Sequence, residues 1–188
     1  MLAYYVERFA TVEINATFYR MPNAKTLASW AATAPAGFTY VLKAPQQITH
    51  FARLREIDEP VRYFADTAAA LGDKLGPVLF QLPPNFKKAP DRLAALLAAW
   101  PVERPIALEF RHESWFDDEV YALLRARNAA LCVAETEEGS TPAVSTADFG
   151  YLRLRAVEYT DDQLRGWLDT MARIGAGWRD AFVFFKHE

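Results

Sequence analysis

The five residues Ala107-Leu108-Glu109-Phe110-Arg111 decide the fold, because large apolar side chains alternate in them with charged ones. Successive side chains of a β-strand point to opposite faces, so Leu108 and Phe110 share one face while Glu109 and Arg111 share the other. Strands buried in an open, doubly wound parallel sheet are apolar on both faces, and this stretch is not. The alternation therefore predicts a closed barrel, with the apolar face toward surrounding helices and the charged face toward the axis.

Two further stretches repeat this alternation. In Thr11–Asn15 the residues of even number are apolar, and the same is true of Tyr151–Arg155. The residues of odd number then face the barrel interior, where the last ones of each strand open onto the C-terminal mouth. The inward set predicted in this way holds ten polar residues, namely Glu13, Asn15, Lys43, Gln81, Glu109, Arg111, Glu135, Arg153, Arg155 and Lys186.

Strand patterns and helix patterns alternate along the chain. The predicted strands are Thr11–Phe18, Phe38–Ala44, Pro77–Leu82, Pro105–Phe110, Ala130–Glu135, Gly150–Arg155 and Asp180–Lys186. The clearest helical periods cover Asn23–Thr33, Pro60–Leu71, Asp91–Trp100 and Asp117–Asn128, and Thr160 with Gln163 has the form of a capping box. The segment Glu137–Asp148 is predicted to be a loop. This order indicates an α/β protein with one domain over residues 1–188, an incomplete TIM-type (β/α)₈ barrel.

Composition excludes several classes of protein. The chain has 188 residues and a formal net charge of −3, so no overall positive field attracts nucleic acid. The single cysteine, Cys132, excludes an intramolecular disulfide, fits a reducing compartment, and is expected in the core. We find neither a signal peptide pattern nor an apolar run as long as a membrane span, so we expect a cytoplasmic protein with no membrane partner.

Five motifs carry a resemblance to a known family. They are Thr-Val-Glu-Ile-Asn-Ala-Thr-Phe-Tyr-Arg (11–20), Lys-Ala-Pro-Gln-Gln-Ile-Thr-His (43–50), Leu-Gly-Asp-Lys-Leu-Gly-Pro-Val-Leu-Phe-Gln-Leu-Pro-Pro (71–84), Leu-Glu-Phe-Arg-His-Glu-Ser-Trp-Phe (108–116) and Phe-Phe-Lys-His-Glu (184–188). With them the chain resembles the YecE-like family, also called domain of unknown function 72, over essentially its whole length. The resemblance implies a TIM-type barrel and no particular reaction. The family's opening Gly-Thr-Ser-Gly-Trp strand and its last helix are absent, so we expect strands two to eight, with a gap between the first and last of them.

Glu109 and Glu13 are the predicted catalytic residues. Both fall near the C-terminal ends of predicted strands, where the active sites of TIM barrels lie, and a carboxyl group there can act as acid or base. An internal Glu109–Arg111 ion pair that only fills the barrel is the alternative, since breaking a buried pair costs about 3–5 kcal/mol.

A surplus of cations on the inward face predicts an anionic ligand. Five inward Lys and Arg residues oppose three Glu residues, which leaves about two positive charges after pairing, and Arg forks match carboxylate and phosphate groups. We predict nine ligand-binding residues at or just after strand ends. They are Arg111, Arg153, Lys186, Lys43, Gln81, Asn15, Tyr19, His112 and Trp115.

These residues predict a protein that acts on, or binds, a small phosphorylated or carboxylated molecule at the barrel mouth. One alternative is a phosphodiester or nucleic-acid-processing enzyme, with or without a metal ion, which the negative net charge does not favour. A second alternative is a barrel that binds a ligand without catalysis. The histidines His50, His112 and His187 lack HxH or HExxH spacing, so no metal ligands are predicted and the cofactor stays unknown. GxSxG, P-loop, Rossmann and CxxC motifs do not occur.

Overall fold

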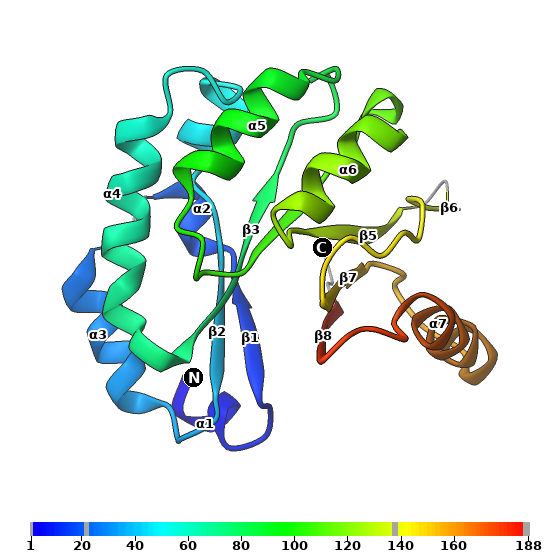
Figure 1. Ribbon diagram of the computed structural model, residues 1–188. Coiled ribbons are helices and arrows are strands. Elements are labelled where there is room, and N and C mark those ends of the chain that lie inside the picture. The colour runs from blue at the N-terminus through cyan, green and yellow to red at the C-terminus, as the bar shows by residue number, and fades with distance from the viewer. Residues whose placement is uncertain (1, 21–22, 137–138, 186–188) are drawn as a thin grey trace.

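Seven parallel strands form a nearly closed barrel in the computed structural model, which describes residues 2–20, 23–136 and 139–185 (Figure 1). Each strand pairs in parallel with the next parallel strand along the chain. They are β1 (Thr11–Ile14), β2 (Thr39–Lys43), β3 (Leu75–Gln81), β4 (Ile106–Glu109), β5 (Ala130–Thr136), β7 (Phe149–Leu154) and β8 (Asp180–Phe185). The prediction of an incomplete TIM-type barrel is confirmed.

Helices alternate with the strands, with α1 before β1, and the longer ones pack on the outside of the sheet (Figure 1). They are α1 (Leu2–Val6), α2 (Ala16–Tyr19), α3 (Ala24–Thr33), α4 (Asp58–Ala68), α5 (Pro90–Ala99), α6 (Asp118–Ala126) and α7 (Asp161–Ile174). Several helices begin at a side chain that accepts a hydrogen bond from a backbone N–H of the first turn. Asn23 does so before α3 and Asp117 before α6. The predicted capping box of Thr160 and Gln163 begins α7.

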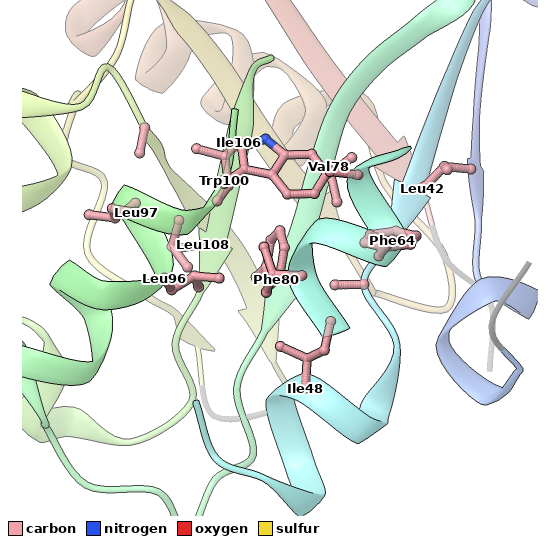
Figure 2. Packing of buried hydrophobic residues seen from close by; sticks show 14 of the residues in the cluster. Leu42, Ile48, Phe64, Val78, Phe80, Leu96, Leu97, Trp100, Ile106 and Leu108 are labelled. Carbon is pink, nitrogen blue, oxygen red and sulfur yellow. The ribbon is translucent and has the colours of Figure 1, made fainter. Parts of the chain in front are cut away.

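The main core lies between the outer face of the strands and these helices. Figure 2 shows Phe80 of β3 close to Trp100, which follows α5, and the two rings meet edge to face with centroids 5.4 Å apart. The ring of Phe64 in α4 packs against the same indole, with ring centroids 5.8 Å apart. Leu108 belongs to this cluster and is fully buried, as its predicted outward parity requires. Burial of these large side chains supplies the main stabilisation of the sheet against its helices.

A second, smaller cluster fills the barrel interior. Val41, Leu79, Ala107, Cys132 and Tyr151 belong to it, and each alternates along its strand with a residue that faces the helices. Cys132 is buried, as predicted. The next inward position after Ala107 is Glu109, so the strand parity that builds this cluster also carries charged groups to the mouth.

Two predicted boundaries need correction. β1 ends at Ile14 rather than Phe18, because Asn15 takes helical backbone angles and begins α2. The Thr17 hydroxyl holds this turn by donating to the Lys43 carbonyl at 2.6 Å. The segment predicted as a loop before β7 contains a two-residue strand, β6 (Gly139–Ser140), which pairs antiparallel with β5.

The barrel has an interruption in its hydrogen bonding. Within the strands described here, β1 and β8 each pair on one side only, and no ladder joins them to one another. This agrees with the expected gap between the first and last strands. Among the described helices, none has the length and apolar character needed to cross a membrane.

Candidate functional site

Glu109 stands at the centre of a group of arginines. It is the last residue of β4, its side chain is fully buried, and its carboxylate pairs with three guanidinium groups. Arg153 donates to Oε2 at 2.6 Å, and Oε1 accepts from Arg155 at 2.9 Å and from Arg111 at 3.1 Å. Burial opposes the charge on Glu109, but the three guanidiniums outweigh it and hold the pKa of this carboxyl below its usual value.

Arg153 links Glu109 to the other predicted carboxylate. Its second terminal nitrogen donates to Glu13 of β1 at 2.8 Å, and only 1% of its side chain is exposed. The Tyr151 hydroxyl donates to the other oxygen of Glu13 at 2.6 Å. Burial and the adjacent Glu13 raise the pKa of Tyr151 well above its usual value, so the phenol stays a donor. These contacts join β1, β4 and β7 through the interior.

Lys43 is the last residue of β2 and lies beside this network. It is 8% exposed, and its Nζ stands 4.0 Å from the centroid of the Phe18 ring. Among the described residues, it has neither a hydrogen-bond acceptor nor a carboxylate within 4.0 Å. Burial and the nearby Arg153 lower the pKa of Lys43 to about 8. His50 meets the same Phe18 ring edge on at 4.9 Å, and burial together with Lys43 lowers the pKa of His50 to about 4.

A pocket of about 440 Å³ opens at the C-terminal ends of β4, β5 and β7. Glu109 and Arg111 line it from β4 and the residues just after it, and Arg155 lines it from the end of β7. Ser140 and Thr141, at and beside β6, form part of its wall. The short antiparallel strand therefore brings polar side chains over the arginines.

The arginines on this pocket keep unused donors. Arg111, whose side chain is 32% exposed, uses only Nε on Glu109. Arg155 uses only one terminal nitrogen of its guanidinium on Glu109. In the part of the chain that the structure describes, the remaining terminal nitrogens of both guanidiniums have no acceptor, and neither does the enclosed Nε of Arg155. The pocket therefore offers charged N–H groups that the protein itself leaves open.

The remaining predicted residues lie in varied positions. Gln81 is buried at the end of β3, in register with Glu109, and Asn15 is half-buried at the start of α2. Tyr19 is 73% exposed on the outside of the same short helix. The Nδ1 atom of His112 accepts from the Ser114 backbone at 3.2 Å and caps a helical turn. Lys186 lies outside the described residues.

The position predicted for Trp115 is wrong. The residue is fully buried in the helix-side core rather than placed at the mouth. Its indole stacks on Phe110 with centroids 4.7 Å apart and donates to the Phe86 carbonyl at 2.6 Å. The turn that His112 caps folds the indole back over the outward face of β4, so the ring leaves the strand end that it follows.

Arg155 lines the pocket but is not in the predicted ligand-binding set. Its parity with Arg153 placed it on the inward face, and that signal was sufficient to include it. Glu135 also belongs to this edge, where its carboxylate accepts from the Arg155 and Ala156 backbone at 3.0 and 3.2 Å and from the Tyr159 hydroxyl. Within the described ranges, no three His, Cys, Asp or Glu side chains gather as a metal site would require.

Fold and site together define a TIM-type barrel protein with an arginine-rich carboxylate cluster at its C-terminal mouth. The family model described as protein of unknown function DUF72 matches residues 1–188, and the chain belongs to this family. The resemblance to YecE-like proteins is therefore confirmed.

Relatives and solved structures agree with this assignment. The chain is 28% identical to the UPF0759 protein YunF of Bacillus subtilis (strain 168) over 200 residues, which cover 97% of this chain and 69% of YunF. It is 32% identical to the UPF0759 protein YecE of Escherichia coli (strain K12) over 115 residues, which are 60% of this chain and 42% of YecE.

Two crystal structures of DUF72 family proteins share the fold. That from Enterococcus faecalis V583 has a TM-score of 0.85 and 17% identity, with 99% of this chain and 86% of that chain covered. That from Thermotoga maritima MSB8 has a TM-score of 0.83 and 24% identity, with 98% and 81% covered. At these identities the likeness concerns the fold alone.

Proposed function

We propose that the barrel mouth binds a small carboxylated or phosphorylated molecule through Arg111 and Arg155. One observation carries this proposal: both guanidiniums line the 440 Å³ pocket and are oriented by Glu109, yet terminal nitrogens of each have no acceptor among the described residues. A planar guanidinium fixed at one edge presents its other edge to an oxyanion in the geometry of a fork. The pocket volume lies in the usual range for small-molecule sites, about 300–1,000 Å³.

The charge of the cluster also favours an anion. Arg111, Arg153 and Arg155 are three cations on two carboxylates, Glu13 and Glu109, so their network has one positive charge in excess. Lys43 adds a second positive charge when protonated. Glu113 lines the rim of the pocket and Glu135 accepts from the Arg155 backbone at the same edge, so both carboxylates oppose this field in part. A monoanionic or dianionic ligand would neutralise the excess in a site of low dielectric constant, where such pairing is strong.

The acid–base role of Glu109 and Glu13 stays a prediction, and the ion pairs favour a different role for Glu109. A carboxylate held by three guanidiniums keeps its charge, so it is a weak base and a poor proton donor near neutral pH. Its oxygens set the direction of Arg111 and Arg155. We therefore assign Glu109 to positioning the two arginines, in the way that second-sphere carboxylates orient ligands elsewhere.

Ligand-induced stabilisation tests the proposal. Inorganic phosphate and malonate are titrated at constant ionic strength, with chloride as the balancing anion, while thermal unfolding is followed. A ligand at ten times its Kd stabilises the folded protein by about 1.4 kcal/mol, and we expect this gain in the wild type. Arg111→Ala should abolish most of it. The matched control is Arg62→Ala on the exposed face of α4, which should respond as the wild type does.

Two results would contradict the proposal. The first is the absence of any anion-specific gain in the wild type at any ionic strength. The second is an equal gain in Arg111→Ala and Arg62→Ala, since binding would then not involve the mouth. A nucleic-acid ligand would instead show binding to oligonucleotides that falls steeply with salt.

A further inference from the structure

Arg155 reaches the mouth pocket from a segment just beyond the end of β7. The ladder between β5 and β7 ends at the pair Ala134–Arg153, and β7 itself ends at Leu154. Arg155 and Ala156 lie beyond both ends, so their backbone N–H groups need acceptors other than the ladder. Whatever accepts from them also fixes the direction in which the Arg155 side chain leaves the strand.

The Glu135 carboxylate is that acceptor. Its Oε2 atom accepts from the backbone N–H groups of Arg155 at 3.0 Å and Ala156 at 3.2 Å, and also from the Tyr159 hydroxyl. The Tyr159 oxygen accepts from the Ala156 N–H at 2.9 Å, so the loop after β7 closes on the carboxylate. Burial and the hydrogen bond to Glu135 raise the pKa of Tyr159 to about 12, so the phenol stays a donor.

Glu135 also joins Arg155 to another part of the pocket wall. Its backbone lies in β5 in register with Ser140 of β6, and Ser140 lines the mouth pocket as Arg155 does. Glu135 is half-buried, and it is not among the described residues that line this pocket. A ligand in the pocket would therefore contact the arginine and not the carboxylate that holds the arginine's backbone.

We propose that Glu135 is a positioning residue that fixes the Arg155 guanidinium at the wall of the mouth pocket. Arg155 is held at both ends, because Glu109 accepts from one terminal nitrogen at 2.9 Å and Glu135 holds the backbone from which the side chain starts. The inference rests on the proposed anion site, since this guanidinium is one of its two forks. A side chain that is already fixed spares the ligand the entropy of ordering it.

The charge of Glu135 and its position predict opposite results when the residue is changed. As a charge, Glu135 opposes the positive field of the arginines, so its removal would strengthen the binding of an anion. As a positioning group, it has to reach the two backbone N–H groups, so loss of the acceptor would weaken binding. Among the described residues, all three donors to this carboxylate meet Oε2, so a Gln amide can keep its oxygen there and place its nitrogen at Oε1.

Three substitutions separate these effects in calorimetric titrations with inorganic phosphate at constant ionic strength. Glu135→Gln keeps an acceptor of the same reach without the charge and should bind phosphate at least as tightly as the wild type. Glu135→Asp keeps the charge but is shorter by a methylene group, and Glu135→Ala removes charge and acceptor together. We expect these two to bind phosphate about ten-fold more weakly, as when an outer-shell partner is lost. The matched control is Glu158→Ala, an exposed acid of the same loop, which should bind at least as tightly as the wild type.

Phenylglyoxal labelling of Arg155, located by peptide mass mapping, measures its accessibility without any ligand. The Arg155 side chain is 14% exposed, so in the wild type and in Glu135→Gln it should react more slowly than Arg62, an exposed residue of α4. In Glu135→Asp the labelling rate of Arg155 should rise toward that of Arg62. The comparison of Gln with Asp decides the question even where Glu135→Ala does not fold.

The outcomes separate this inference from the proposed function. In a protein that binds phosphate, equal affinity of Glu135→Asp and the wild type, or unchanged labelling of Arg155 in Glu135→Asp, overturns the positioning role and leaves the anion site standing. Binding by Glu135→Gln as weak as that by Glu135→Asp overturns it as well, because an acceptor of the right reach would then not suffice. If the wild type binds no phosphate but Arg155 is labelled faster in Glu135→Asp, the anion site is overturned and the positioning role stands.

Discussion

At the scale of single residues, the mouth contains arginines with the same partner and different environments. Arg153 is 1% exposed and bridges Glu109 and Glu13, whereas the Arg111 side chain is 32% exposed and touches Glu109 alone. A buried cation between two buried acids holds the fold together. Arg111 is partly exposed, and Glu109 keeps Arg153 and Arg155 as partners if Arg111 turns away, so Arg111 is free to bind a ligand.

Substitution by methionine should separate these roles. Arg153→Met leaves two buried carboxylates short of a partner, and we expect a loss of about 3–5 kcal/mol in the free energy of unfolding. Arg111→Met should lose about 1 kcal/mol or less, because exposed pairs contribute little and Arg153 and Arg155 still neutralise Glu109. Urea denaturation at pH 7 measures both values. Equal losses would mean that Arg111 is as structural as Arg153.

Lys43 should make the stability of the protein depend on pH in a direction opposite to that of a paired lysine. Its pKa is about 8 in the folded chain and returns to about 10.5 on unfolding. Between these values the unfolded chain binds the extra proton, so the free energy of unfolding rises with pH. Relative to Lys43→Met, the wild type should gain up to about 3 kcal/mol between pH 8 and 10.5.

The comparison with Lys43→Met cancels the titration of all other groups that respond equally in both proteins. Below pH 8 the difference between the two proteins should be constant, because Lys43 is protonated in the folded and unfolded chains alike. Chemical denaturation across this range measures it. A difference that falls as pH rises would show that Lys43 has an acidic partner in solution.

At the scale of elements, the strands were predictable because apolar and polar side chains alternate along them with a period of two, and turn residues mark where each strand ends. The overrun of β1 past Ile14 has a physical cause, since Ala16, Thr17 and Phe18 continue the alternation. What ends the strand is a contact between Thr17 and the Lys43 carbonyl, 26 residues away, which no local pattern reports. Trp115 was misplaced for a related reason, because its stacking on Phe110 depends on a turn.

The charged part of the candidate site was predictable from the same parity. Glu13, Lys43, Glu109, Arg111 and Arg153 were expected together, and the structure brings them together. Which arginine takes which carboxylate was not predictable, because it depends on the stagger of neighbouring strands around the barrel. The expected pairing of three acids with three cations is replaced by three arginines on one carboxylate.

An arginine outside the site fixes the contact between two helices. Arg127, just after α6, donates to the carbonyls of Leu97, Trp100, Pro101 and Val102 at the end of α5. Leu97 lies in the last turn of α5, where Pro101 has no N–H to donate to its carbonyl, and the other three residues follow the helix. The Pro101 carbonyl also accepts from the Arg104 backbone N–H at 3.1 Å, so the guanidinium adds to that bond and supplies donors to the others. Arg127→Met should lower the free energy of unfolding by about 2 kcal/mol, as measured by urea denaturation.

The matched control for this prediction is Arg125→Met. Arg125 is an exposed residue in the last turn of α6 and should cost about 0.5 kcal/mol or less. The anion response of both variants should equal that of the wild type, because neither residue lines the mouth pocket. Similar stability of the two variants would show that water replaces the guanidinium at the end of α5.

At the scale of the whole molecule, side chains replace backbone pairing across the interrupted part of the barrel. The described β1 and β8 do not pair, yet Glu13 of β1 accepts from Arg153 and Tyr151 of β7 through the interior. The candidate site is thus also the tie between the first strand and the last ones. The residues available for binding are those that this tie does not consume, chiefly Arg111, Arg155 and Lys43.

Hydrogen exchange should reveal the tie. Glu13→Gln removes the charge that Arg153 and Tyr151 share, and we expect a loss of about 3 kcal/mol in local stability, as for other broken buried pairs. Amides of β1, which pairs on one side only, should then exchange faster, while those of β3 and β4, which pair on both sides, should change little. Glu103→Gln makes the same chemical change on an exposed residue and should leave every strand as it is. If Glu13→Gln accelerated exchange uniformly over all strands, the barrel would open as one cooperative unit, and the interior ion pairs would stabilise the whole sheet instead of fastening its first strand.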